Sequence, residues 1–157
     1  MKLVSVLAAY LALFGLTVIS ENSLKWETNV ELAQKKAIKE AKPYLVYFTG
    51  SDWCGPCKSL SKEFFDDSEF NSMASSFILV KLDIPRRIDI ISEKEMTYNK
   101  EKLSELNPSK KFPTLIAFSK TGKEIDRISG YSGDGDASSY LNFIKVVLED
   151  IPQGSNQ

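Results

Sequence analysis

Residues 44–58, YLVYFTGSDWCGPCK, carry the pattern from which we predict the fold of this chain. This stretch opens with a short apolar run after a proline, and such a run between helix breakers is typical of a buried strand. A polar loop then leads to Cys54 and Cys57, which stand three positions apart. Pro56 suits the first turn of a helix, where the N–H group that proline lacks would have no partner. The stretch therefore predicts a buried strand, a loop and a helix that opens at the cysteines.

Helices and strands alternate on both sides of this stretch. Apolar residues recur at helical spacing in residues 30–41, where acidic residues come early and lysines late, as the helix dipole favours. A second apolar run at residues 77–82 would complete a β-α-β unit with parallel strands. The other predicted elements are the helix from residue 54 to about 66, a helix over 92–106, strands over 114–118 and 124–128, and a helix over 137–148. This order predicts an α/β fold with a central mixed four-stranded sheet flanked by helices.

The 157 residues suggest one folded domain, preceded by a segment that would direct export. Lys2 and the apolar run over residues 3–19 fit a secretory signal peptide, because the run is short for a membrane-spanning helix. We expect a signal peptide at 1–20, a linker at 21–25, the domain at 26–150 and a flexible tail at 151–157. A retained membrane anchor is the alternative for the first segment. Both alternatives predict a periplasmic or secreted protein.

Composition and charge exclude several classes of function. The chain has no histidine, which excludes Ser-His and Cys-His nucleophiles and histidine-ligated metal sites. Two cysteines cannot supply a four-thiolate zinc site, so we expect neither a metal nor a cofactor. The formal net charge is -1, with lysines scattered among acids, which indicates no basic surface for nucleic acid. The two cysteines are therefore the residues from which we expect chemistry.

Two thiols at this spacing, at the start of a helix, can close a small disulfide ring and open it again. The thiolate is the attacking form, and the first turn of a helix stabilises it. We therefore predict that Cys54 is the nucleophile and that Cys57 is the resolving thiol. A static structural disulfide is the alternative, but closing so short a loop would add little stability.

Three segments of the chain, in this order, resemble the thioredoxin superfamily. They are Trp53-Cys54-Gly55-Pro56-Cys57-Lys58, the strand that contains Lys81, and Phe112-Pro113-Thr114. The resemblance spans residues 26–148 and implies a thioredoxin fold in which Pro113 is a cis proline facing the active site. The residues that it implies for the redox motif are Trp53, Gly55 and Pro56, and those for substrate contact are Trp53, Phe112 and Pro113.

A closer resemblance is to exported thioredoxin-like proteins of the DsbH type. The matching residues are Phe48-Thr49-Gly50-Ser51-Asp52-Trp53-Cys54, Asp83-Ile84-Pro85, Trp26 and Gly130-Tyr131. One departure concerns the buried aspartate of thioredoxins, which is held to relay protons to the resolving cysteine, because the matching strand here offers Tyr47 and Phe48. Asp52, Glu63 and Lys81 are the candidates for that role. Our hypothesis is that water or the departing thiolate deprotonates the resolving thiol instead.

The resemblance implies a thiol-disulfide oxidoreductase, and the residues between the cysteines indicate its direction. Gly55-Pro56 resembles the pair found in reducing thioredoxins, so we predict a reductase of exported disulfide-containing proteins. A membrane thiol reductase would supply its electrons, and we expect a monomer. The alternatives are a disulfide isomerase, an oxidase, or a non-catalytic binding module on the same scaffold. The turn at Pro85-Arg86-Arg87 is either a docking patch or a solvated turn.

Overall fold

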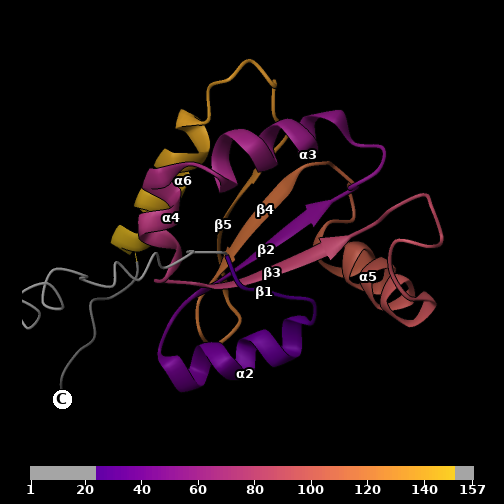
Figure 1. Cartoon of the computed structure of the whole chain (residues 1–157). Coiled ribbons are helices and arrows are strands. Elements are labelled where there is room, and N and C mark those ends of the chain that lie inside the picture. The colour runs from indigo at the N-terminus through magenta and orange to yellow at the C-terminus, as the bar shows by residue number, and fades with distance from the viewer. Residues whose placement is uncertain (1–23, 151–157) are drawn as a thin grey trace, which may run out of the picture.

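Five strands form one mixed sheet in the computed structural model, which describes residues 24–150 (Figure 1). The strands are β1 (Trp26–Glu27), β2 (Tyr44–Thr49), β3 (Ile78–Asp83), β4 (Thr114–Phe118) and β5 (Glu124–Ser129). Their order is β1-β3-β2-β4-β5, with β1, β3 and β2 parallel and β4 antiparallel to both of its neighbours. The strand that leads to the cysteines, β2, therefore lies at the centre of the sheet.

The sheet has one strand more than the four that the sequence predicts, so that detail of the prediction was wrong. Trp26 and Glu27 pair with Leu79 and Val80 of β3 and form the edge strand β1. A two-residue strand carries too few side chains to show an alternating pattern, so no periodicity in the sequence marks it. The open edge of β3 decides its position instead.

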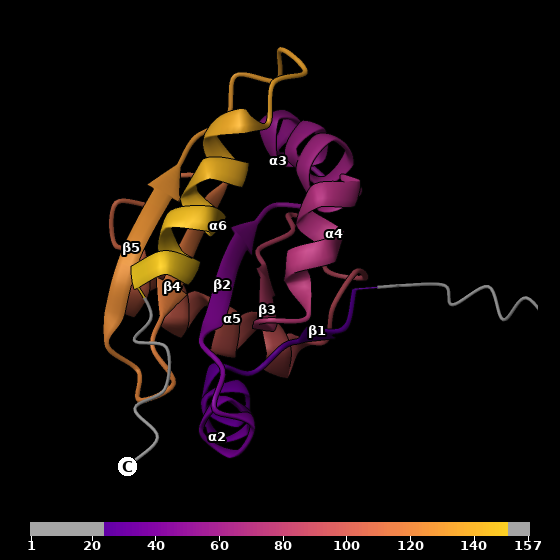
Figure 2. The ribbon, with the colours of Figure 1, turned by 90° about the vertical axis from the view of Figure 1, so that its left-hand side faces the viewer.

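Helices cover both faces of the sheet (Figure 1, Figure 2). The helices are α2 (Val30–Glu40), α3 (Gly55–Leu60), α4 (Ser68–Ala74), α5 (Glu93–Leu106) and α6 (Ser138–Asp150). The helices α3, α4 and α6 pack over Leu45 and Tyr47, whereas α2 and α5 pack over Val46 and Phe48. Because successive side chains of a strand point to opposite faces, the fully buried strand β2 contributes to both cores.

The helix predicted from Cys54 to about residue 66 is not continuous in the structure. The helix α3 passes into a π-helical turn over Ser61–Phe65, and α4 then starts as a separate helix. Two adjacent residues of a regular helix point in different directions, whereas the wider π turn leaves both Phe64 and Phe65 in the same core. The predicted helix is therefore interrupted where Phe64 and Phe65 both pack into the core.

The start of α4 depends on Asp67, whose carboxylate accepts the N–H groups of Glu69 and Phe70 at 2.7 and 3.2 Å. This is an N-cap, which satisfies backbone donors that have no partner within the helix. The sequence analysis did not predict α4, because its two buried residues, Phe70 and Ala74, have helical spacing but are too few to establish a period over seven residues.

The bounds of the other predicted elements are confirmed to within two residues at each end. The predicted signal peptide at 1–20, part of the linker and the predicted tail at 151–157 lie outside the described residues. Within residues 24–150, no helix combines the length and the apolar character needed to cross a membrane.

Candidate active site

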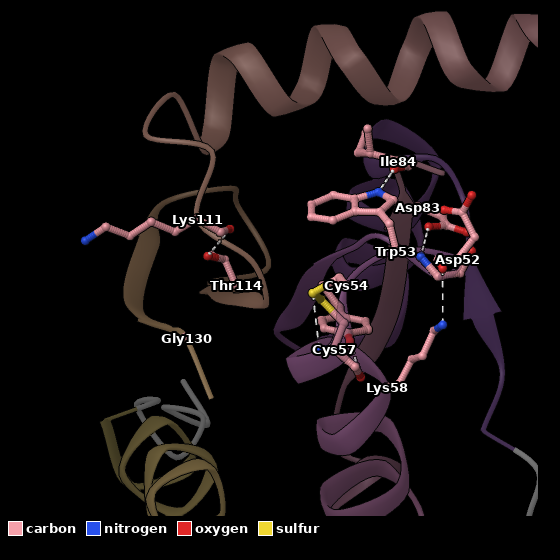
Figure 3. The surroundings of a disulfide bond; sticks show 12 residues. Asp52, Trp53, Cys54, Cys57, Lys58, Asp83, Ile84, Lys111, Thr114 and Gly130 are labelled. Atoms are coloured by element: carbon pink, nitrogen blue, oxygen red, sulfur yellow. Dashed lines mark hydrogen bonds between the residues drawn. A yellow bond between two sulfur atoms is a disulfide. The ribbon is translucent and has the colours of Figure 1, made fainter. Parts of the chain in front are cut away.

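The two cysteines lie where the central strand β2 passes into α3, and a disulfide bond joins them (Figure 3). The connecting loop is tight because the N–H group of Cys54 donates to the carbonyl of Gly50 at 2.8 Å. Cys54 caps α3, since its sulfur accepts the N–H group of Cys57 at 3.2 Å. The prediction that a helix opens at the cysteines, with Pro56 in its first turn, is confirmed.

The surroundings of the two sulfur atoms suit different roles. The N–H group directed at the sulfur of Cys54 would stabilise a thiolate at that position. Both cysteines are buried in the oxidised protein, but Cys54 is 4% exposed and Cys57 is 1% exposed, so Cys54 is the more accessible of the two by a small margin. Gly55 and Pro56, between them, are exposed, and a Cβ placed on Gly55 would meet open space. This arrangement agrees with Cys54 as the nucleophile and Cys57 as the resolving thiol.

Trp53 and Phe112, two of the predicted substrate contacts, come from distant segments and meet edge to face with their ring centroids 5.2 Å apart. The indole N–H group of Trp53 donates to the carbonyl of Ile84 at 2.7 Å. The indole lies against Gly50, where any side chain would overlap it. The peptide bond between Phe112 and Pro113 is cis. The structure thus gathers two aromatic rings beside the active-site loop.

The three residues that were candidates for a proton carrier have other positions or contacts. Lys81 is exposed on β3. The carboxylate of Glu63 accepts a hydrogen bond from the hydroxyl of Tyr131, in the segment before α6. Asp52 accepts the backbone N–H groups of Arg86 and Arg87 at distances between 2.9 and 3.1 Å. Desolvation acts to raise the pKa of Asp52, but these N–H groups favour its charged form and hold the pKa below the ordinary value. Asp52 therefore ties a neighbouring loop to the site.

A buried carboxylate to which the sequence analysis gave no role, Asp83, ends β3 beside Thr49 of β2. It is 7% exposed, and it accepts the N–H group of Ser51 at 2.8 Å. Its own carbonyl accepts the side-chain amide of Asn99 from α5, also at 2.8 Å. Asp83 thus holds the first turn of the active-site loop. The sequence feature that could have identified Asp83 is an acidic residue at the end of an apolar strand.

Tyr47 occupies a buried position beneath α3, at the strand where thioredoxins carry an acid. It is 1% exposed, and its hydroxyl donates to the carbonyl of Cys57 at 3.3 Å. Burial raises the pKa of Tyr47, while hydrogen bonds with Thr49 and Ser61 act in the opposite direction. The phenol therefore stays protonated near neutral pH. It acts as a hydrogen-bond donor that holds the first turn of the helix, and not as a base.

Tyr47→Phe should lower the free energy of unfolding of the oxidised protein by about 1 kcal/mol, because a buried carbonyl loses one of its donors. Tyr44→Phe is the matched control, since Tyr44 is 3% exposed on the same strand but faces the other core. It should cost no more than a few tenths of a kcal/mol. Urea unfolding of both variants measures the difference, and equal losses would contradict a specific role for the Tyr47 hydroxyl.

A cysteine pair three residues apart, at the first turn of a helix over a mixed sheet of this order, can attack another disulfide through a thiolate when it is reduced and close to a disulfide in return. This combination of fold and site defines the class of thiol-disulfide oxidoreductases. The chain belongs to the thioredoxin-like domain family, whose pattern matches residues 30–145. The predicted fold and enzyme class are thereby confirmed.

Individual relatives agree with this assignment. The chain is 30% identical over 135 residues to the disulfide bond reductase DsbH of Chlamydia pneumoniae, and the match covers 83% of this chain and 76% of that protein. It is 29% identical over 161 residues to the thioredoxin-related protein DsbJ of the same organism, across 96% of this chain but 44% of DsbJ. A solved structure of a DsbH oxidoreductase is similar with a TM-score of 0.67 and 26% identity, over 81% of this chain and 85% of that one. The predicted resemblance to the DsbH type is confirmed.

Proposed function

We propose that this protein reduces disulfides in exported proteins by dithiol-disulfide exchange through Cys54 and Cys57. The observation that carries the proposal is the similarity to a disulfide bond reductase over most of the chain, combined with a disulfide at the start of α3. Gly55 and Pro56, the pair that resembles reducing thioredoxins, support the same direction.

The exchange would proceed in two steps from the reduced protein. The thiolate of Cys54 attacks one sulfur of the substrate disulfide, forms a mixed disulfide and expels the other substrate sulfur as a thiolate. The sulfur of Cys57 then attacks Cys54, closes the disulfide seen in the structure and releases the second substrate thiolate. Two electrons pass to the substrate, and the two thiol protons of the protein end on the substrate thiols.

The substrate would lie along the surface that Trp53, Phe112 and Pro113 form beside the disulfide. An extended segment can pair with backbone next to Pro113, which withholds a donor, while the two aromatic rings provide apolar contact. We place the protein in the periplasm or outside the cell, because residues 1–20 have the pattern of a signal peptide or an anchor. A membrane thiol reductase would restore the dithiol, and the protein would act as a monomer.

The direction of the reaction is tested by the equilibrium reduction potential of residues 21–157 against a glutathione series, read by thiol alkylation. We expect a value near that of thioredoxin, about -270 mV, and faster reduction of a protein disulfide than oxidation of a reduced, unfolded protein. A potential above about -200 mV, with oxidation the faster reaction, would contradict the proposed reductase and favour an oxidase or an isomerase.

A further inference from the structure

The connection between β3 and α5, residues 84–92, is packed onto the active-site loop. Its first carbonyl, that of Ile84, accepts the indole N–H group of Trp53 at 2.7 Å. Two of its N–H groups, those of Arg86 and Arg87, donate to the carboxylate of Asp52. Pro85, between these contacts, is buried. The sequence analysis allowed either a docking patch or a solvated turn at residues 85–87. The structure shows that this turn packs against the active-site loop.

The side chain of Arg86 lies on the face of the active-site tryptophan. Its guanidinium carbon is 4.9 Å from the centroid of the Trp53 ring, a cation–π contact. The next arginine, Arg87, is paired with Asp89 at 2.5 Å. Among residues 24–150, none of the ion pairs includes Arg86, although the side chain is exposed. Its charge helps to hold the pKa of the nearby Asp52 carboxyl low, but no carboxylate among the described residues is paired with it directly, so the guanidinium group can also attract a molecule that binds here.

The position of this charge relative to the disulfide is set by the indole. Trp53 directly precedes Cys54, and Figure 3 shows its ring beside the disulfide with Ile84 beyond it. A substrate that brings a sulfur atom to Cys54 must place the residues next to its cysteine near this ring. Those residues would then lie within reach of the guanidinium group.

On the basis of the proposed reductase function, we propose that Arg86, held on Trp53, favours substrate disulfides whose cysteine has a carboxylate side chain within two residues. A guanidinium group over the face of a ring leaves N–H donors for another partner, and these donors match the two oxygens of a carboxylate. The hydrogen bonds to Asp52 and Ile84 already hold the loop in place, so little conformational entropy is lost on binding. The site would thus select substrates by charge as well as by the presence of a disulfide.

The experiment uses the full chain in its reduced form, in a single turnover with disulfide-linked dimers of a short peptide. One peptide carries aspartate on both sides of its cysteine, and the second carries lysine there. The protein dithiol gives two electrons and two protons to each dimer, which yields two peptide thiols and the Cys54–Cys57 disulfide. The rates are read by acid quench, alkylation and chromatography. The measured quantity is the ratio of the rate for the acidic dimer to the rate for the basic one.

Three variants separate the role of Arg86 from intrinsic reactivity and from net charge. Arg86→Gln removes the charge, and Arg86→Glu reverses it. Lys123→Glu changes the net charge by the same amount as Arg86→Glu. Lys123 is exposed in the β4–β5 turn, at the end of the sheet opposite to the cysteines. The intrinsic reactivity of each peptide is the same for all variants, so it cancels when their ratios are compared. Incomplete folding of a variant also cancels, because both peptides meet the same protein.

We expect the ratio to fall roughly two- to fivefold in Arg86→Gln, as is typical of one exposed charge pair, and further in Arg86→Glu. The native ratio should also fall in 0.5 M salt, which screens exposed charges. Lys123→Glu should keep the native ratio. An unchanged ratio in Arg86→Gln would overturn the selectivity while leaving the reductase function in place. The same holds if the ratio falls as far in Lys123→Glu as in Arg86→Glu. Failure of the native protein to reduce either dimer would overturn the proposed function and the selectivity with it.

Discussion

Cys57→Ser should convert the protein from a turnover catalyst into a trap that stays covalently bound to its substrates. Cys54 keeps its position as the cap of α3, so it still attacks a substrate disulfide. The mixed disulfide then persists, because the resolving sulfur is replaced by a hydroxyl that does not attack disulfides. We expect multiple turnover of a protein disulfide to fall by about two orders of magnitude or more, with one substrate molecule retained per protein.

The matched variant is Cys54→Ser, which should lose turnover to the same extent but form no mixed disulfide. The remaining thiol, Cys57, belongs to the first turn of α3 and is 1% exposed, against 4% for Cys54. Non-reducing electrophoresis followed by mass spectrometry distinguishes the two variants. Equal trapping by both would contradict the assignment of distinct roles. A protein that holds the same partners without any covalent adduct in either variant would be a binding module.

Phe64→Ala should destabilise the protein by about 3–5 kcal/mol, because it removes a fully buried ring at the centre of a cluster beneath the active-site helix. The ring centroid of Phe64 lies 4.4 Å from that of Phe70 and 5.4 Å from that of Tyr140, so the change leaves a cavity between α4 and α6. Such a loss is a large fraction of the stability of a domain of this size. We expect the midpoint of thermal unfolding to fall by roughly 10 °C or more.

Leu32→Ala is the control for this variant, since Leu32 is 59% exposed on α2 and should change stability by no more than about 0.5 kcal/mol. Chemical unfolding of the oxidised forms measures both variants under the same conditions. A small loss for Phe64→Ala would show that the π turn can move and close the cavity. In that case the packing of Phe64 does not hold α3 and α4 in their observed positions.

The departures from the predicted fold occur where distant residues decide the conformation. The strand β1 depends on the edge of β3, which lies about fifty residues further along the chain. The π turn places Phe64 and Phe65 in one core, and its formation depends on rings from α4 and α6. The apolar pattern of this region is compatible with a regular helix, so the sequence pattern predicts one.

The candidate site divides in the same way. The pair Cys54 and Cys57, its helix start and the hairpin after Pro113 were predicted from local patterns. The contact between Tyr47 and Cys57, and the loop that places Arg86 on Trp53, were not. No local sequence pattern around Tyr47 or Arg86 predicts which distant residue its side chain contacts.

The strand, the loop and the cysteine pair at the start of a helix follow from the sequence alone, because apolar runs, turn residues and cysteine spacing act over a few neighbouring residues. The tertiary contacts determine the pairing of β1 with β3 and of β2 with β4, the hydrogen-bond partners of the loop carboxylates, and the side chains that surround the disulfide. Those contacts depend on the register of the sheet and on loops such as residues 84–92, which bring distant segments together. Hydrogen bonds such as those of Asp52 and Asp83 form only once that register exists.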